Sequence, residues 1–109
     1  MAENLQNEAV DVMNPGKEDP SMALKLQLMG YLKEIIVEKG WNQTWAAKEL
    51  GISRSRLCRL LGGDLKNVSE GRLVECLTTL GRDVQIFIGP EHRGTGTVLV
   101  LKLPEFKRF

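Results

Sequence analysis

The fold is decided by residues 43–62, which read QTWAAKELGISRSRLCRLLG. A helix-turn-helix unit needs two helices that cross steeply over a turn of three or four residues. Ala47 provides a small residue where the helices would cross, and Gly51 provides the glycine that a turn with positive φ favours. The apolar residues that would fill the space between the helices are Ala46, Leu50, Ile52, Leu57 and Leu60. The stretch predicts a helix-turn-helix, with two packed helices of a generic bundle as the alternative.

Helix signals continue on both sides of this stretch. Apolar residues at steps of three and four predict a helix over residues 23–39, which Ser21 can cap and Gly40 would end. Helices are also predicted over 43–50, 54–61 and 70–80, preceded by the capping residues Asn42, Ser53 and Ser69. We therefore expect a mainly α, helix-turn-helix domain of four to five helices over residues 23–82.

The apolar pattern changes its period after this domain. Residues 83–89 alternate, with Val84, Ile86 and Ile88 on one face, and residues 97–103 are apolar on both faces for most of their length. A turn-rich loop lies between these two segments. The sequence therefore predicts that a C-terminal β-hairpin within residues 83–109 follows the helical domain.

Such a hairpin would leave an apolar edge without a partner. A two-stranded hairpin is barely stable by itself in water, and an exposed apolar edge favours aggregation. The same strand from a second copy, related by a two-fold axis, is the simplest partner and would complete a four-stranded sheet. We expect residues 83–103 to form the interface of a homodimer. The alternative is that the hairpin folds back on its own helices and that the copies meet through the first helix.

Charge is unevenly distributed along the chain, although the net charge is only +1. Residues 1–22 carry one basic and five acidic residues and include Pro15, Gly16 and Pro20, which predicts a flexible acidic arm. Residues 23–66 carry eight basic against four acidic residues, and a DNA contact would need positive charge here. A solvated helical surface would give the same balance.

No sequence pattern typical of a catalytic or metal site is present. Cys58 and Cys76 lie in apolar helical patterns, where cysteine acts as a small hydrophobic residue. His92 stands alone in a Gly-rich loop without neighbours at ligand spacing. No apolar run approaches about 18 residues, and the N-terminus lacks the layout of a signal peptide. We expect a cytoplasmic protein that is not an enzyme and binds no metal, cofactor or membrane.

Several short motifs give the chain a resemblance to a known family. They are WNQT at 41–44, the alanine and turn within 47–53, the leucines of 57–61, and residues 68–84. With these motifs the chain resembles the Cro/repressor-type (Xre-like) helix-turn-helix regulators, and more narrowly the compact antitoxins related to HigA. The resemblance implies a strand after the last helix that pairs with its twin across a dimer axis. Two features depart from the family: Trp45 replaces a usually polar residue, and the second strand is an extension.

The second helix of the motif carries the candidate base-reading residues. In this class the N-terminal part of that helix enters the major groove. On a helical wheel its leucines define the buried side, and Ser55 and Arg59 point away from them. Arg54 lies in the first turn, where a long side chain can reach outward, and Arg56 lies on the flank. We expect Arg59, Arg54 and Ser55 to read bases and Arg56 to contact a base or a phosphate. Solvated surface arginines are the alternative.

Phosphate contacts are expected around this helix. The family resemblance implies that Gln43 holds a phosphate near the start of its helix. Further candidates are Thr44, Lys48, Lys66 and Asn67, for which a plain surface role is the alternative.

Three functions fit these features. The first is a repressor that binds double-stranded DNA as a homodimer on a palindromic operator, plausible as the autoregulating antitoxin of a toxin-antitoxin pair. The second is an antitoxin whose main role is to neutralise a small toxin protein, for which the acidic arm could serve against a basic toxin. The third is a regulator of a phage or mobile element without a toxin.

Overall fold

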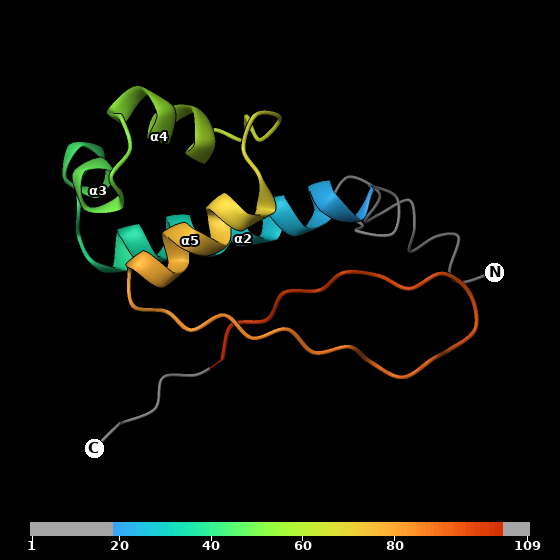
Figure 1. Ribbon diagram of the computed structural model, residues 1–109. Helices are drawn as coiled ribbons and strands as arrows, with labels where there is room; N and C mark the ends of the chain where they lie inside the picture. The colour runs from blue at the N-terminus through green and yellow to red at the C-terminus, as the bar shows by residue number, and fades with distance from the viewer. Residues whose placement is uncertain (1–18, 104–109) are drawn as a thin grey trace, which may run out of the picture.

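The computed structural model describes residues 19–103, and these contain four α-helices (Figure 1). The helices are α2 (Pro20–Glu38), α3 (Gln43–Leu50), α4 (Arg54–Leu61) and α5 (Glu70–Thr79). The helical part of the predicted fold is therefore confirmed. The acidic arm predicted over residues 1–22 lies outside the described residues, except for its last four positions, where α2 begins.

Capping side chains begin each helix. Asn42 Oδ1 accepts a hydrogen bond from Trp45 N at 2.8 Å, and the hydroxyls of Ser53 and Ser69 bind the third residue of α4 and α5 in the same way. The first helix begins differently from the prediction. Its cap is Asp19, whose Oδ1 accepts from Met22 N at 3.0 Å, and Pro20 occupies the first turn.

Ser21 ties α2 to α5 instead of capping α2. Its hydroxyl donates a hydrogen bond to the Glu70 carboxylate in the first turn of α5. This hydrogen bond, together with a backbone hydrogen bond at Glu70, lowers the pKa of that carboxyl group. A negative charge in the first turn also suits the positive end of the helix dipole.

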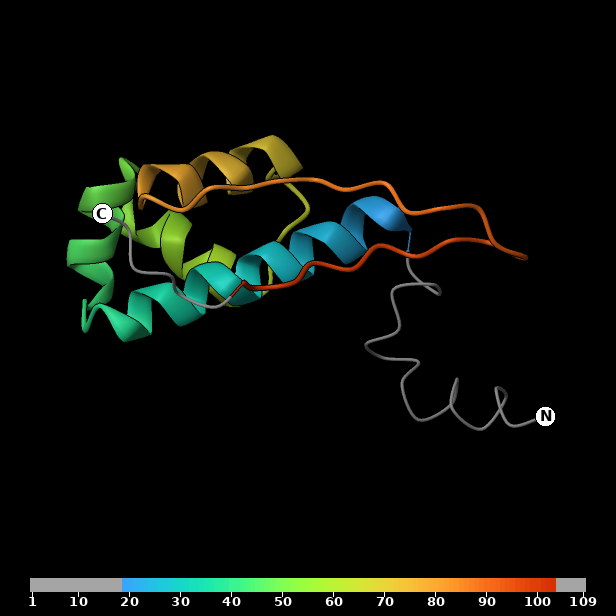
Figure 2. The same cartoon turned by 90° about the horizontal axis from the view of Figure 1, so that it is seen from below.

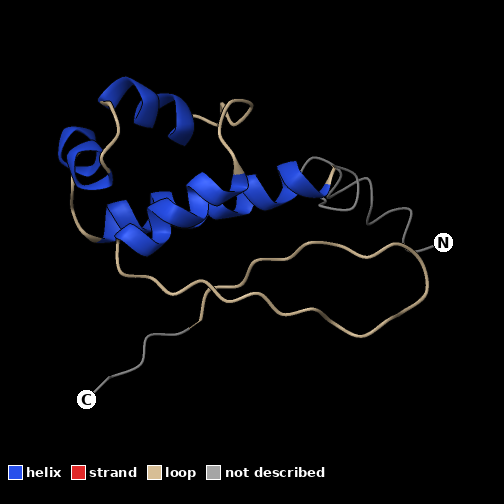
Figure 3. Ribbon diagram, viewed as in Figure 1, coloured by secondary structure: helices blue, strands red, loops and turns tan. Residues whose placement is uncertain are grey.

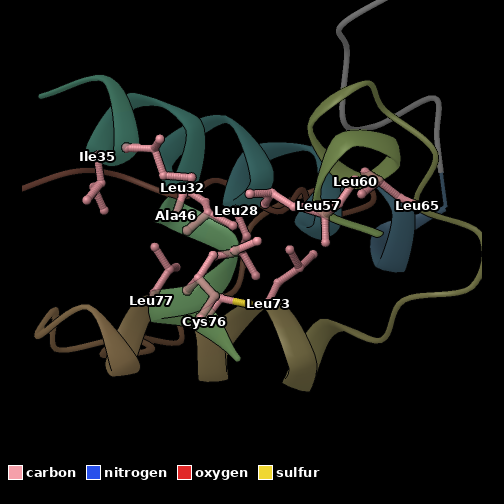
Figure 4. Close-up of a cluster of buried hydrophobic side chains, with 13 residues drawn as sticks. Leu28, Leu32, Ile35, Ala46, Leu57, Leu60, Leu65, Leu73, Cys76 and Leu77 are labelled. Carbon is pink, nitrogen blue, oxygen red and sulfur yellow. The ribbon is translucent and has the colours of Figure 1, made fainter. Parts of the chain in front are cut away.

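One apolar core joins all four helices (Figure 4). Leu32 of α2, Leu57 of α4, Leu73 of α5 and Leu65 of the connecting loop are almost completely buried. No polar or charged side chain among the described residues is buried with them. Burying one such leucine contributes roughly 1.5–3 kcal/mol, so this core is the main source of stability for the helical arrangement.

The predicted C-terminal β-hairpin is wrong. Residues 82–103, called here the C-terminal segment, contain no β-strand, and Figure 3 shows this part of the chain as a loop. The segment runs out along α5, turns back and returns along α2 (Figure 2). The alternation of side chains in the sequence reflects extended backbone, but the two arms do not form a ladder of backbone hydrogen bonds with each other.

The returning arm is held by side chains of α2 instead of by a neighbouring strand. Gln27 donates to the carbonyl of Val98 at 2.9 Å and accepts from the amide of Val100 at 2.8 Å. The Tyr31 hydroxyl donates to the carbonyl of Val100 at 3.0 Å. Lys102 pairs with Glu34 at 3.2 Å and Glu38 at 3.0 Å. Backbone groups that a hairpin would pair together are thus bound to the helix.

The apolar side chains of the C-terminal segment differ in burial. Val84 and Val100 pack against the helical core. Val98 is half-buried. Six large apolar side chains stay exposed by 65–90%, and they are Ile86, Phe87, Ile88, Leu99, Leu101 and Leu103. In Figure 1 the segment lies on one side of α2 and α5, and α3 and α4 lie on the other.

None of the helices in the described part of the chain is sufficiently long and apolar to span a membrane.

Candidate nucleic-acid interface

The turn between α3 and α4 sets the direction of α4. Gly51 ends α3 with φ at 72°, a left-handed conformation that glycine adopts without strain. Two residues later Ser53 begins α4, and its hydroxyl accepts from Arg56 N at 3.1 Å. Leu57 and Leu60 then face the core, so the opposite face of α4 is turned to solvent.

All four predicted base-reading residues lie exposed on α4. Arg54 and Ser55 occupy its first turn, and the Ser55 hydroxyl lies 3.4 Å from that of the capping residue Ser53. Arg56 and Arg59 lie one helical turn apart and border a groove beside the helix. The structure therefore divides the four candidates into a pair at the tip of the helix and a pair along its side.

The groove lies between α4, the loop that follows it and the beginning of α5. It has a volume of about 350 Å³. Arg56 and Arg59 line it from α4, Asp64 and Asn67 from the loop, and Arg72 from α5. Leu60 and Cys76, both buried, also line it, so the charged groups stand over a partly apolar floor. Burial raises the pKa of the Cys76 thiol, which keeps this floor uncharged.

The predicted phosphate-binding residues are less closely grouped. Gln43 is the first residue of α3 and is half-buried, and Thr44 beside it is exposed. The Lys48 ammonium lies 5.1 Å from the centre of the Trp45 ring. Lys66 and Asn67 are exposed in the loop after α4, and Asn67 lines the groove that also contains Arg56 and Arg59.

Three side chains around the motif differ in burial. Trp41 packs against the core, which fits its position between the first two helices. Trp45 is 46% exposed, so it belongs to the surface of α3. Cys58 is exposed on α4, although it lies in an apolar helical pattern. Only Cys76 of the two cysteines is buried.

Arg72 also lines this groove and was not among the residues predicted to contact DNA. It is the third residue of α5, close to the positive end of the helix dipole, where a basic residue is unfavourable in isolation. That mismatch was visible in the sequence, because Ser69 marks the start of the helix. Only the folded chain, however, brings Arg72 to the same groove as Arg56 and Arg59.

No group of three or more His, Cys, Asp or Glu side chains within residues 19–103 is arranged to hold a metal ion.

Comparison with known proteins places this geometry in context. A family model described as a helix-turn-helix domain matches residues 9–89. A solved structure described as that of an XRE family transcriptional regulator is similar, with a TM-score of 0.72 and 28% sequence identity. The similarity covers 77% of this chain and 97% of that chain. The search of curated proteins gave no match.

Proposed function

The chain belongs to the helix-turn-helix domain family, and from this we propose that it is a DNA-binding transcriptional regulator of the Xre type. The observation that carries the proposal is the exposed, arginine-rich face of α4, which Ser53 and the turn at Gly51 aim away from the core. A helix in this setting fits the major groove of B-DNA, where its N-terminal residues meet the edges of the bases. Its place of action would be the cytoplasm.

The candidates for base recognition are arginines and a serine of α4. An arginine binds O6 and N7 of guanine with two hydrogen bonds, and a serine hydroxyl can bind several base edges. We assign this role to Arg54, Ser55 and Arg59. Gln43, at the N-terminus of α3, is assigned to a phosphate, because a helix N-terminus attracts anions.

Two substitutions test this division of roles. Arg59→Ala should cost roughly 1–3 kcal/mol on the cognate site and relax the preference at one or two base pairs. Gln43→Ala should weaken binding to cognate and random duplexes by similar factors, because phosphates are common to both. Lys33→Ala, at an exposed position of α2, serves as a charge-removing control outside the helix-turn-helix motif. Equal losses on both duplexes for Arg59→Ala would exclude it as a base reader.

We further propose that the protein acts as a homodimeric repressor on a palindromic operator. One recognition helix reads only a few base pairs, so two half-sites about 34 Å apart would give the specificity that a regulator needs. The exposed apolar side chains of the C-terminal segment supply a surface for the second copy. This segment exposes six large apolar side chains by 65–90%, which is unusual for a monomer.

The arrangement of the helices limits how such a dimer can form. Because α4 and the C-terminal segment lie on opposite sides of α2 and α5, a contact between the outermost faces of two segments would turn the α4 helices away from each other. Both helices can meet one DNA duplex only if the copies join along a flank of the segment. Sedimentation of the protein with footprinting on its upstream DNA tests this proposal, and protection of one isolated half-site by a monomer would contradict it.

An antitoxin role is the finer form of this proposal. It is supported by the resemblance to the compact antitoxins related to HigA and by the acidic composition of residues 1–22. Co-expression with the product of a neighbouring small gene, followed by co-purification and a growth assay, tests it. Restored growth that requires residues 1–22 would support toxin binding, and operator binding without any such partner would favour a regulator that has no toxin.

A further inference from the structure

We propose that the groove between α4 and α5 holds a phosphate of the DNA backbone, and that Arg72 is a DNA-binding residue. The inference rests on the proposed function, because it concerns the same face of the molecule. It adds a contact outside the helix-turn-helix motif, on α5, for which no DNA contact was predicted.

The first argument is charge. Three arginines, Arg56, Arg59 and Arg72, line a groove whose only acidic lining residue is Asp64. Within residues 19–103 neither Arg56 nor Arg59 has an ion-pair partner. The three guanidinium groups make the groove positive. Arg56 and Arg72 are the two that would bind the phosphate, because guanidinium geometry matches its oxygens and Arg59 is assigned to a base.

The second argument is the position of Arg72. It occupies the first turn of α5, where the helix dipole disfavours a cation, and no acidic neighbour in the groove is bound to it. Its partner is Glu75 of the same helix, with Nη1 and Oε1 2.8 Å apart. The side chains of this pair are 37% and 63% exposed. Exposed ion pairs of this kind are weak, so a phosphate can replace the Glu75 carboxylate.

The third argument is the relation of the groove to α4. Arg56 and Arg59 line it from the same helix that presents Arg54 and Ser55 at its tip. A helix inserted into the major groove is flanked by the two phosphate backbones, and most protein–DNA hydrogen bonds go to these backbones. A groove along the side of α4, lined by cations, therefore lies where a backbone would pass. Asn67 and Ser69 add polar groups to its rim.

The test is the salt dependence of DNA binding by the full chain, measured by fluorescence anisotropy on an operator duplex and a random duplex. Arg72→Gln should weaken binding to both by roughly five- to tenfold at about 0.1 M salt and reduce the slope of log K against log salt by about 0.9. Arg72→Lys should retain most of the slope. Asp64→Asn should strengthen binding to both duplexes, because it removes a negative charge from the groove.

Two variants separate this effect from a structural one. Glu75→Gln breaks the same ion pair but leaves Arg72 free, so it should bind DNA at least as tightly as the unmodified chain. Arg93→Gln removes an arginine outside the groove and should leave the slope unchanged. An unmodified chain that binds no duplex would defeat the proposed function itself. A chain that binds its operator with Arg72→Gln indistinguishable from Arg93→Gln would overturn only the present inference.

A small anion is the competing occupant, and inorganic phosphate is its probe. Saturable shifts of the Arg72 and Asn67 signals in NMR spectra with millimolar phosphate, together with unchanged DNA binding by Arg72→Gln, would assign the groove to a small anion and overturn the DNA contact. Loss of DNA affinity in Arg72→Gln with no saturable phosphate binding is the expected result.

Discussion

The helical core and the C-terminal segment are built from the same apolar residue types but bury them very differently. Leu73 in α5 is 0% exposed, whereas Leu101 in the C-terminal segment is 71% exposed. A helix satisfies most of its backbone hydrogen bonds internally, so it can place a whole apolar stripe against its neighbours. An extended segment must find partners for its backbone as well as its side chains. Within residues 19–103, α2 provides hydrogen-bond partners for the backbone of the returning arm through Gln27 and Tyr31.

Because they differ in burial, the two regions have different roles. The core stabilises one protomer and fixes α4, and the C-terminal segment leaves apolar surface available for a second molecule. Substitutions in the core should therefore change the free energy of unfolding, and substitutions on the outer side of the segment should change association.

The largest expected effect is in the core. Leu73→Ala should reduce the free energy of unfolding by about 2–5 kcal/mol, because it leaves a cavity among fully packed side chains. Urea unfolding followed by circular dichroism measures it. The matched control is Leu103→Ala, at a position 65% exposed, which should stay within about 0.5 kcal/mol of the unmodified chain when both are unfolded at a concentration at which the chain is monomeric. Equal losses at the two positions would remove the distinction between the regions.

A second substitution addresses association. Changing both Leu99 and Leu101 to Ser should weaken dimerisation at least about tenfold, which corresponds to roughly 1.4 kcal/mol, and leave the helical circular dichroism signal intact. Sedimentation equilibrium measures the change. Val37→Ser, at an exposed apolar position of α2, is the control. Dissociation by Val37→Ser alone would move the interface to the first helix. A chain truncated after Arg82 that stays folded and fully dimeric would exclude the C-terminal segment.

A smaller effect is expected where the two regions meet. Gln27→Ala removes both hydrogen bonds to the returning arm, each part-buried, and should weaken its attachment by about 1 kcal/mol. Hydrogen exchange at the Val100 amide reports this directly, because that amide donates to Gln27. Gln85→Ala, on the exposed part of the outgoing arm, should leave the exchange rate unchanged. Unaltered protection at Val100 in Gln27→Ala would show that the arm is held in another way.

The smallest effect is a pH dependence of the same attachment. Hydrogen bonds to Glu38 and then Glu34 raise the pKa of Lys102, and Arg82 also faces Glu38, at 3.6 Å. A raised pKa means that the attached arm favours charged Lys102. The stabilisation of the attached arm by the Lys102 charge is therefore complete below the ordinary lysine pKa of about 10.4. It is lost as the pH rises through the raised pKa of Lys102. NMR chemical shifts of the returning arm, followed from neutral to alkaline pH, should show a step that Lys102→Gln abolishes.

Residues close together in the sequence determined the helices and the motif. Asn42, Ser53 and Ser69 cap the helices that they were predicted to cap, and Gly51 takes the positive φ that the turn requires. These features depend on hydrogen bonds within one helical turn, so the local sequence is sufficient to predict them. The spacing of Leu57 and Leu60 likewise fixed which face of α4 would be buried.

Contacts between distant residues decided what the sequence left open or predicted wrongly. The alternation after Asp83 indicated extended backbone, but whether that backbone pairs with itself or with α2 depends on Gln27 and Tyr31, about seventy residues away from Val98 and Val100. In the same way, Ser21 binds Glu70 across the fold instead of capping its own helix. The groove that contains Arg56, Arg59 and Arg72 is lined by residues of both α4 and α5, with the buried Leu60 and Cys76 among them, so it exists only in the folded chain. A polar group of the backbone or a side chain can have several possible partners, and it binds the one that the packed core brings within reach. No local sequence pattern indicates which partner that is.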